Sequence, residues 1–160
     1  MAGRSSGTEH PGAARHPGIV RVRLATDRDP TRRREGGTPM TSRTAVSLTT
    51  GMEDPEKVTV AMLVAVGAAE AGRETVMFLT KEAVRLALAG YPVGVACDGC
   101  PPLPSLMQRY ADAGGKFLVC PICFTARQLE AASVSGNAAL GGTVQLWEWI
   151  GDDPVVTFSY

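Results

Sequence analysis

From residue 43 onward, short apolar runs alternate with longer stretches that carry the signals of helices. The apolar runs have the length and the Val, Thr and Phe content of β-strands. Asp54 before Pro55, and Pro121, suit the start of a helix. The pattern predicts strands at 43–50, 75–80, 91–97, 116–120 and 155–160, helices at 55–71, 81–89, 101–115, 121–133 and 143–151, and a loop around 135–142.

Strands that alternate with helices of this length indicate βαβ units. The sequence therefore predicts an α/β fold: a three-layer sandwich with a mostly parallel sheet of about five strands and helices on both faces. In such sheets the functional loops lie beyond the carboxyl ends of the strands. Two close cysteine pairs, Cys97 with Cys100 and Cys120 with Cys123, each follow a predicted strand. If the two strands are neighbours, all four sulfurs are expected on one rim of the sheet.

Two of the predicted helices carry expectations about burial. The helix at 55–71 is apolar nearly all round, which favours burial inside an assembly over a wet surface. Trp147 and Trp149 stand two residues apart in the last predicted helix, so they cannot share one face of it. One of these tryptophans is expected in the core.

The first forty residues differ in kind from the rest of the chain. They hold eight arginines against four acidic residues, many Gly and Pro, and almost no aliphatic periodicity. Such a segment buries too little apolar surface to offset its ordering entropy. We therefore interpret residues 1–41 as a disordered tail or an overextended start before Met40, without a secretory signal. The folded domain is expected over residues 42–160.

Charge and hydropathy make two classes of partner unexpected. Residues 41–160 hold eight basic residues against twelve acidic ones, so the body is mildly acidic and gives no electrostatic reason to expect nucleic acid. The longest apolar stretch, residues 58–69, is well short of the roughly 20 residues that a membrane-spanning helix needs. Neither nucleic acid nor a membrane is predicted as a partner.

Missing residue types narrow the chemistry further. Both histidines, His10 and His16, lie in the first forty residues, so the predicted domain has no imidazole base. This excludes Ser-His-Asp and Cys-His catalysis and any His-containing metal site in the core. No glycine-rich phosphate loop of the Walker or dinucleotide type is present. Sulfur chemistry remains as the main candidate.

Zinc binding is one interpretation of the four cysteines. Cys97, Cys100, Cys120 and Cys123 have the spacing C-x₂-C-x₁₉-C-x₂-C, which matches a four-Cys zinc site. However, the nineteen residues between the pairs are predicted as helix plus strand, whereas zinc ribbons use tight hairpin turns. The main expectation is therefore that the protein has no cofactor, and a structural zinc ion is kept as an alternative.

Thiol–disulfide exchange is a second interpretation. A strand followed by Cys-Pro-x-Cys and a helix is how thioredoxin-like proteins place a nucleophilic thiol. Cys120 would lie near the unpaired N–H groups of a helix start, which stabilise a thiolate, and Cys123 would resolve a mixed disulfide. A thioredoxin-like fold usually carries this motif early in its chain, and a later strand with a cis-proline faces it. Here the motif comes late, and Pro154 is the only proline after it.

A third interpretation comes from resemblance. The stretch FLVCPICFTARQLE (117–130) resembles the strand–cysteine–helix signature of the DsrE/DsrF-like family of small sulfur-relay proteins. Cys120 takes the cysteine position and Arg127, seven residues on, the arginine position, while Gln128 stands where the family often has Gly. The opening strand, loop and helix (47–65), the second strand and helix (74–90) and the closing strand (155–160) are also similar.

The resemblance implies a cytoplasmic α/β protein that assembles into trimers or hexamers and has sulfurtransferase activity. Cys120 would accept persulfide sulfur from a donor protein and pass it to an acceptor protein. Cys123, together with the Cys97 and Cys100 pair, would release the sulfur or protect the thiol by forming a disulfide. The Cys97 and Cys100 pair is less typical of the family. Arg127 either steers an anionic persulfide or is an ordinary ion-paired surface residue.

Overall fold

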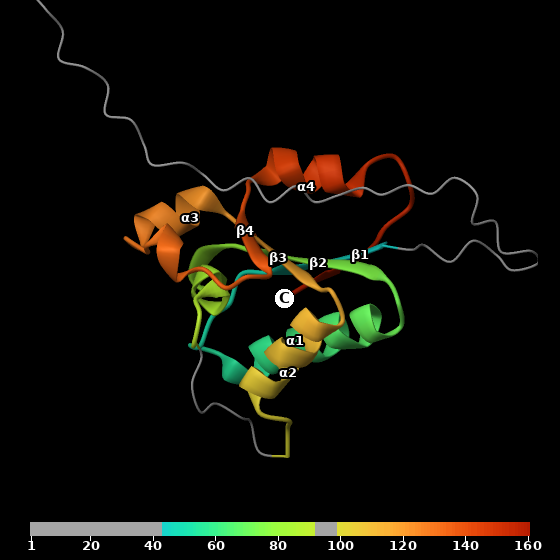
Figure 1. Ribbon diagram of the computed structural model, residues 1–160, viewed down its shortest axis with the longest axis horizontal. Helices are drawn as coiled ribbons and strands as arrows, with labels where there is room; N and C mark the ends of the chain where they lie inside the picture. Colours follow the sequence, from blue (N-terminus) through green and yellow to red (C-terminus); the bar gives the residue numbers. More distant parts are fainter. Residues whose placement is uncertain (1–42, 92–98) are drawn as a thin grey trace, which may run out of the picture.

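A computed structural model describes residues 43–91 and 99–160, and the predicted tail at 1–41 lies outside them. In this part of the chain five parallel strands form one sheet in the order β4-β3-β2-β1-β5 (Figure 1). The register pairs Leu48 with Leu79 and Leu79 with Val119, so these strands end level with one another. The strands are β1 (Arg43–Leu48), β2 (Glu74–Leu79), β3 (Lys116–Val119), β4 (Ala138–Leu140) and β5 (Val156–Ser159).

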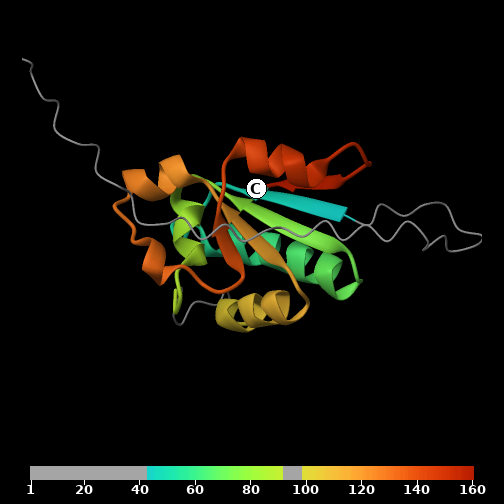
Figure 2. The same ribbon diagram turned by 45° about the horizontal axis from the view of Figure 1, so that its top comes forward.

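Helices cover both faces of the sheet, which confirms the predicted three-layer α/β fold. In Figures 1 and 2, α1 (Pro55–Glu70) and α2 (Leu103–Asp112) lie against one face. The opposite face carries α4 (Thr143–Ile150), while the short α3 (Pro121–Ala126) follows β3 directly. Two 3₁₀ segments complete the described chain, η1 (Lys81–Ala87) and η2 (Ala131–Ser133).

The larger apolar cluster lies between the sheet and the pair α1 and α2. Helix α1 begins as the sequence predicts, because the Asp54 carboxylate accepts a hydrogen bond of 3.0 Å from the Lys57 amide and Pro55 opens the helix. It presents a continuous set of small and branched side chains to the sheet. The cluster includes Val46, Leu48, Val58, Ala61, Met62, Ala65, Val66, Met77, Leu79, Leu106, Tyr110, Phe117 and Val119.

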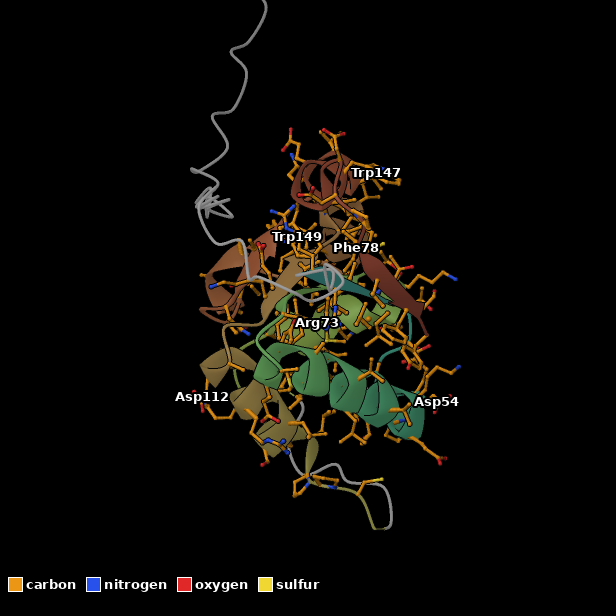
Figure 3. The ribbon with its side chains drawn as sticks, turned by 90° about the vertical axis from the view of Figure 1, so that its right-hand side faces the viewer. Asp54, Arg73, Phe78, Asp112, Trp147 and Trp149 are labelled. Atoms are coloured by element: carbon orange, nitrogen blue, oxygen red, sulfur yellow. The ribbon has the colours of Figure 1, made fainter. Side chains whose placement is uncertain are left out.

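A smaller cluster lies under α4. Trp149, Phe78 and Leu118 belong to it, and Trp149 is only 3% exposed whereas Trp147 is 68% exposed. Figure 3 shows Trp149 and Phe78 between α4 and the sheet, with Trp147 on the outer side of the helix. The expectation that one of the two tryptophans is buried in the core is therefore confirmed.

Arg43, the first residue of β1, holds the carboxyl end of α4 onto the sheet. Its Nη1 donates to the carbonyls of Trp149 (2.8 Å) and Ile150 (3.2 Å). Its Nε donates to Glu74 at 3.0 Å, and the Glu74 carboxylate also accepts the Trp149 indole N–H at 2.9 Å. A cation is favoured where a helix ends, because the last carbonyls are unpaired and partly negative. The side chain of Arg43 thus joins residues more than a hundred positions apart.

Tyr110 connects α2 to the start of β3. Its hydroxyl lies 3.1 Å from the Thr75 carbonyl and 2.9 Å from the Lys116 carbonyl, to which it donates. Burial raises the pKa of Tyr110 well above its usual value, so the hydroxyl keeps its proton. The ring packs directly over Gly115, where any added Cβ would overlap it.

Several element boundaries differ from the predictions. The helix expected at 81–89 is the 3₁₀ segment η1, which stops at Ala87 because the Ala89 amide instead donates to the Ser133 carbonyl. The helix expected at 121–133 ends at Ala126. The predicted loop at 135–142 contains β4, which pairs with β3. The strand expected at 91–97 lies, apart from Tyr91, outside the described residues.

Replacing glycine by alanine should have opposite effects on stability at Gly115, which lies under the Tyr110 ring, and at Gly67, which has open space around it. Gly115→Ala should lower the free energy of unfolding by about 1–3 kcal/mol, because the added methyl group overpacks a buried ring. Gly67→Ala, at an exposed position of α1 with no atom within 4 Å of the new Cβ, should raise it by about 0.5–1 kcal/mol. Chemical denaturation of both variants checks this. A Gly115→Ala protein as stable as the wild type would contradict the described contact.

Candidate functional site

Cys120 lies at the carboxyl end of β3, on the inner part of the sheet. Its amide donates to the Leu79 carbonyl at 3.0 Å, which continues the β2–β3 ladder, and its carbonyl accepts the Phe124 amide at 3.0 Å, which starts α3. The residue is therefore fixed from both sides by backbone hydrogen bonds. Its thiol is free and partly exposed, and it packs against the cluster under α4.

Cys123 lies one helical turn further on and is also a free, partly exposed thiol. It packs against the other cluster, the one between the sheet and α1 and α2, next to the buried Phe124. The two sulfurs of the Cys-Pro-Ile-Cys motif therefore contact different apolar clusters. Cys120 and Cys123 have distinct surroundings although they are three residues apart.

Arg127 is ion-paired. Its Nε and Nη2 both lie 2.7 Å from Glu82 Oε1, and its Nη1 donates to the Cys123 carbonyl at 3.1 Å. The side chain is 21% exposed. This geometry holds the end of α3 against η1. A role for Arg127 in steering an anionic persulfide stays a prediction.

The Glu82 carboxylate accepts hydrogen bonds from two arginines, Arg85 and Arg127. Besides Arg127, its carboxylate accepts the Arg85 Nε at 3.0 Å. Hydrogen bonds from Arg127 first and Arg85 second hold the pKa of Glu82 below its usual value of 4.5. The carboxylate is consequently ionised at neutral pH and binds both guanidinium groups.

Gly51 brings a third loop to the same place. A Cβ at this position would lie 2.9 Å from both the Cβ and the carbonyl oxygen of Glu82, so only glycine allows the approach. The Gly51 amide donates to Glu53 Oε1 at 2.9 Å, which fixes the loop before α1. The segments that follow β1, β2 and β3 therefore meet around Glu82. Sequence reasoning did not select Gly51 or Glu82; the only local signal was a glycine soon after a strand.

Two residues of this region other than glycine adopt left-handed backbone. Lys81 has φ +48° and Gln128 has φ +53°. Gln128 follows the end of α3, where a left-handed residue commonly closes a helix and glycine fits best. The glycine that the resemblance expects at this position therefore has a physical reason. Gln128 adopts the same conformation at a cost in free energy.

Cys100 belongs to the segment that precedes α2. Residues 99–102 lie below α1 and α2, on the side away from α3 in Figures 1 and 3. Cys100 is disulfide-bonded, and Cys97 lies outside the described residues. Within 43–91 and 99–160, no three Cys, His, Asp or Glu side chains gather as ligands for a metal ion. The four-cysteine zinc hypothesis stays a prediction, and it would require the disulfide of Cys100 to be reduced, because zinc binds thiolates.

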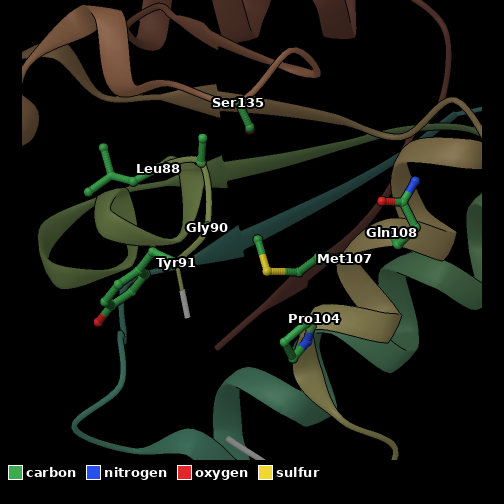
Figure 4. A pocket seen from close by; sticks show the side chains of 8 residues that line it. Leu88, Gly90, Tyr91, Pro104, Met107, Gln108 and Ser135 are labelled. Atoms are coloured by element: carbon green, nitrogen blue, oxygen red, sulfur yellow. The ribbon is translucent and has the colours of Figure 1, made fainter. Parts of the chain in front are cut away.

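A separate cavity of about 350 Å³ lies between the end of η1 and α2 (Figure 4). Its walls are largely apolar, and none of the described cysteines reaches it. The lining residues are Leu88, Ala89, Gly90, Tyr91, Pro104, Met107, Gln108 and Ser135.

No helix in the described part of the chain is long and apolar enough to cross a bilayer.

The fold and the site define a class: a parallel α/β domain with a free thiol where an inner strand meets a short helix. The chain belongs to the DsrE/DsrF-like family, whose sequence profile matches residues 43–158. This confirms the resemblance seen in the sequence, and at the level of the family it indicates sulfur relay.

Solved structures agree with this assignment at the level of the fold. The ychN protein from E. coli superposes with a TM-score of 0.60 at 15% identity, over 74% of this chain and 99% of that protein. MTH1491 from Methanobacterium thermoautotrophicum, a protein of unknown function, gives a TM-score of 0.52 at 8% identity, over 74% and 98%. A search of curated protein sequences gave no match.

Because the Glu82 carboxylate binds Arg127 at the end of α3, we expect Glu82 to stabilise α3 against local unfolding. Glu82→Gln should speed hydrogen exchange of the Phe124, Arg127 and Gln128 amides, because Arg127 loses its charged partner. Because the folded pKa of Glu82 is lowered, its contribution is complete above about pH 4.5 and is lost as pH falls through the folded value. Wild-type exchange in α3 should therefore approach that of Glu82→Gln in acid.

Glu70→Gln is the matched control, since Glu70 pairs with Arg109 at 2.8 Å between α1 and α2. It removes an equivalent ion pair away from α3. Hydrogen exchange followed by mass spectrometry resolves the two regions. If both variants affect α3 equally, or neither does, Glu82 does not have the described role.

Proposed function

We propose that this protein carries persulfide sulfur on Cys120 and transfers it to an acceptor protein. The observation that supports this most directly is the free, partly exposed Cys120 thiol at the β3–α3 junction, in a chain of the DsrE/DsrF-like family. Backbone hydrogen bonds on both sides fix the Cys120 backbone, so the thiol is attached at a defined point of the fold.

The transfer chemistry needs no redox cofactor. The Cys120 thiolate attacks the outer sulfur of a donor persulfide; a new S–S bond forms, the old one breaks, and the donor leaves as a thiolate. Cys120 then holds the sulfur as a persulfide. An acceptor thiolate attacks that outer sulfur in turn and regenerates the Cys120 thiolate. Each step exchanges one S–S bond for another, so there is no net oxidation.

Cys123 is assigned an accessory role. Its thiolate can attack the inner sulfur of the Cys120 persulfide, which releases hydrosulfide and leaves a Cys120–Cys123 disulfide. A thiol reductant then has to restore both cysteines. A reducing compartment such as the cytoplasm keeps the thiols available for either route.

Thiol–disulfide exchange by Cys120 and Cys123 is the second candidate. It is favoured by two free thiols three residues apart at the start of a helix. The two candidates differ in what Cys120 carries after reaction: an extra sulfur atom in the first, a bond to Cys123 in the second. A structural zinc ion on the four cysteines remains a third, untested prediction.

Intact-mass measurement after incubation with a persulfide donor tests the proposal. Wild type and Cys123→Ser should each gain the mass of one sulfur atom, and reduction with dithiothreitol should remove it. Cys120→Ser should gain none, because the accepting nucleophile is gone. The proposal fails if wild type gains no sulfur or if Cys120→Ser gains as much. A Cys120–Cys123 disulfide with a potential of roughly −270 to −120 mV would instead support the redox candidate.

We also expect the chain to form a homo-oligomer, a trimer or a hexamer. Val60 and Leu63 on α1 and Val156 and Phe158 on the edge strand β5 are exposed apolar side chains that an assembly would cover. Light scattering coupled to size exclusion should give three or six chain masses. Leu63→Lys should lower that mass if α1 lies at the interface. A single-chain mass at every concentration contradicts this expectation.

A further inference from the structure

Three cations lie in the segments directly after β2 and β3, Lys81 and Arg85 in η1 and Arg127 at the end of α3, and two of them are occupied. Arg85 and Arg127 both bind the Glu82 carboxylate, and Arg127 also donates to the Cys123 carbonyl. Arg127 thereby joins the end of α3 to η1, while the Arg85–Glu82 pair lies within η1. A reacting anion at Cys120 therefore meets groups that already have a partner. The third cation, Lys81, differs in this respect.

Lys81 is the first residue of η1, which packs against β3, the strand that ends just before Cys120. The Cys120 amide bonds to the Leu79 carbonyl at 3.0 Å, so Lys81 lies two residues beyond the last contact between β2 and β3. Segment η1 packs against both β3 and α3. Lys81 is exposed, and within the described residues its ammonium group has no hydrogen bond or ion pair.

Lys81 occupies a backbone position that would favour glycine, so the presence of a lysine there needs an explanation. Its φ of +48° is left-handed, which an L residue adopts at a cost and glycine adopts freely. This turn carries the chain from β2 into η1 and places Glu82 against Gly51 and Arg127. A glycine would make the same turn with less strain. Stability alone therefore does not account for a lysine here, and strained positions of this kind gather at functional sites.

We infer that Lys81 is the cation that receives the anionic sulfur group reacting at Cys120. The inference rests on the proposed function, because persulfides and thiolates are anions at neutral pH and repel the Cys120 thiolate as they approach. An ammonium group within reach of the thiol would offset that repulsion and raise the local concentration of the anion. Lys81 recognises the charge, while Cys120 remains the nucleophile.

The charge effect is measured without any persulfide by comparing iodoacetate with iodoacetamide. The two reagents alkylate thiolates by the same reaction, but only iodoacetate is an anion. The ratio of their rates at Cys120, followed by peptide mass mapping of the full chain, reports the local charge. Any change in the thiolate fraction affects both rates equally and cancels in the ratio.

In Lys81→Gly the iodoacetate-to-iodoacetamide ratio should fall about two- to fivefold at low ionic strength. The difference should disappear near 1 M salt, where the screening length is about 3 Å. Lys81→Arg should retain the wild-type ratio. Lys81→Gly should also denature at a higher denaturant concentration than the wild type, because it relieves the left-handed backbone, so failure to fold is not expected.

Two controls separate charge from backbone. Gln128→Gly relieves the other left-handed residue without changing charge, so it should gain stability and keep the ratio. Lys116→Gln removes an exposed lysine at the opposite end of β3 and should also keep the ratio. An unchanged ratio in Lys81→Gly, or an equal fall in either control, overturns the inference. Sulfur uptake by Cys120 is measured separately, so a failure of the proposed function is distinguishable from a failure of this assignment.

Discussion

The hydrogen bond from the Cys120 amide to the Leu79 carbonyl determines where Cys120 lies in the fold. It is the last contact between β2 and β3, and it brings the starts of η1 and α3 together at one edge of the sheet. Glu82 then holds the two segments to each other through Arg127, and Gly51 brings the loop after β1 against the same carboxylate. A parallel sheet makes this possible, since all its strands end on the same side.

Much of the fold was accessible from local patterns. Asp54 and Pro55 mark the start of α1 because the cap and the first helical position have their own chemistry, independent of the rest of the chain. Cys120 was placed correctly between a strand and a helix for the same reason. The family signature added the arginine position, and the left-handed φ of Gln128 explains the glycine that commonly follows it.

The missed features depend on partners distant in sequence. β4 is three residues in a Gly-rich stretch, and it is a strand because β3 offers an open edge. η1 ends early because Ala89 bonds to Ser133, and Arg127 meets Glu82 across 45 positions. No hydrophobic period or capping rule contains such information. Of the candidate site, sequence reasoning therefore selected Cys120, Cys123 and Arg127 but not Glu82, the carboxylate that binds Arg127.

The separate surroundings of the two thiols have a consequence for communication within the domain. Cys120 contacts the apolar cluster under α4, and Cys123 contacts the one shared with α1 and α2. A covalent link between their sulfurs would tie the two cores across the end of the sheet. Any strain in such a bond would act on both apolar clusters, and therefore on the helices on both faces of the sheet.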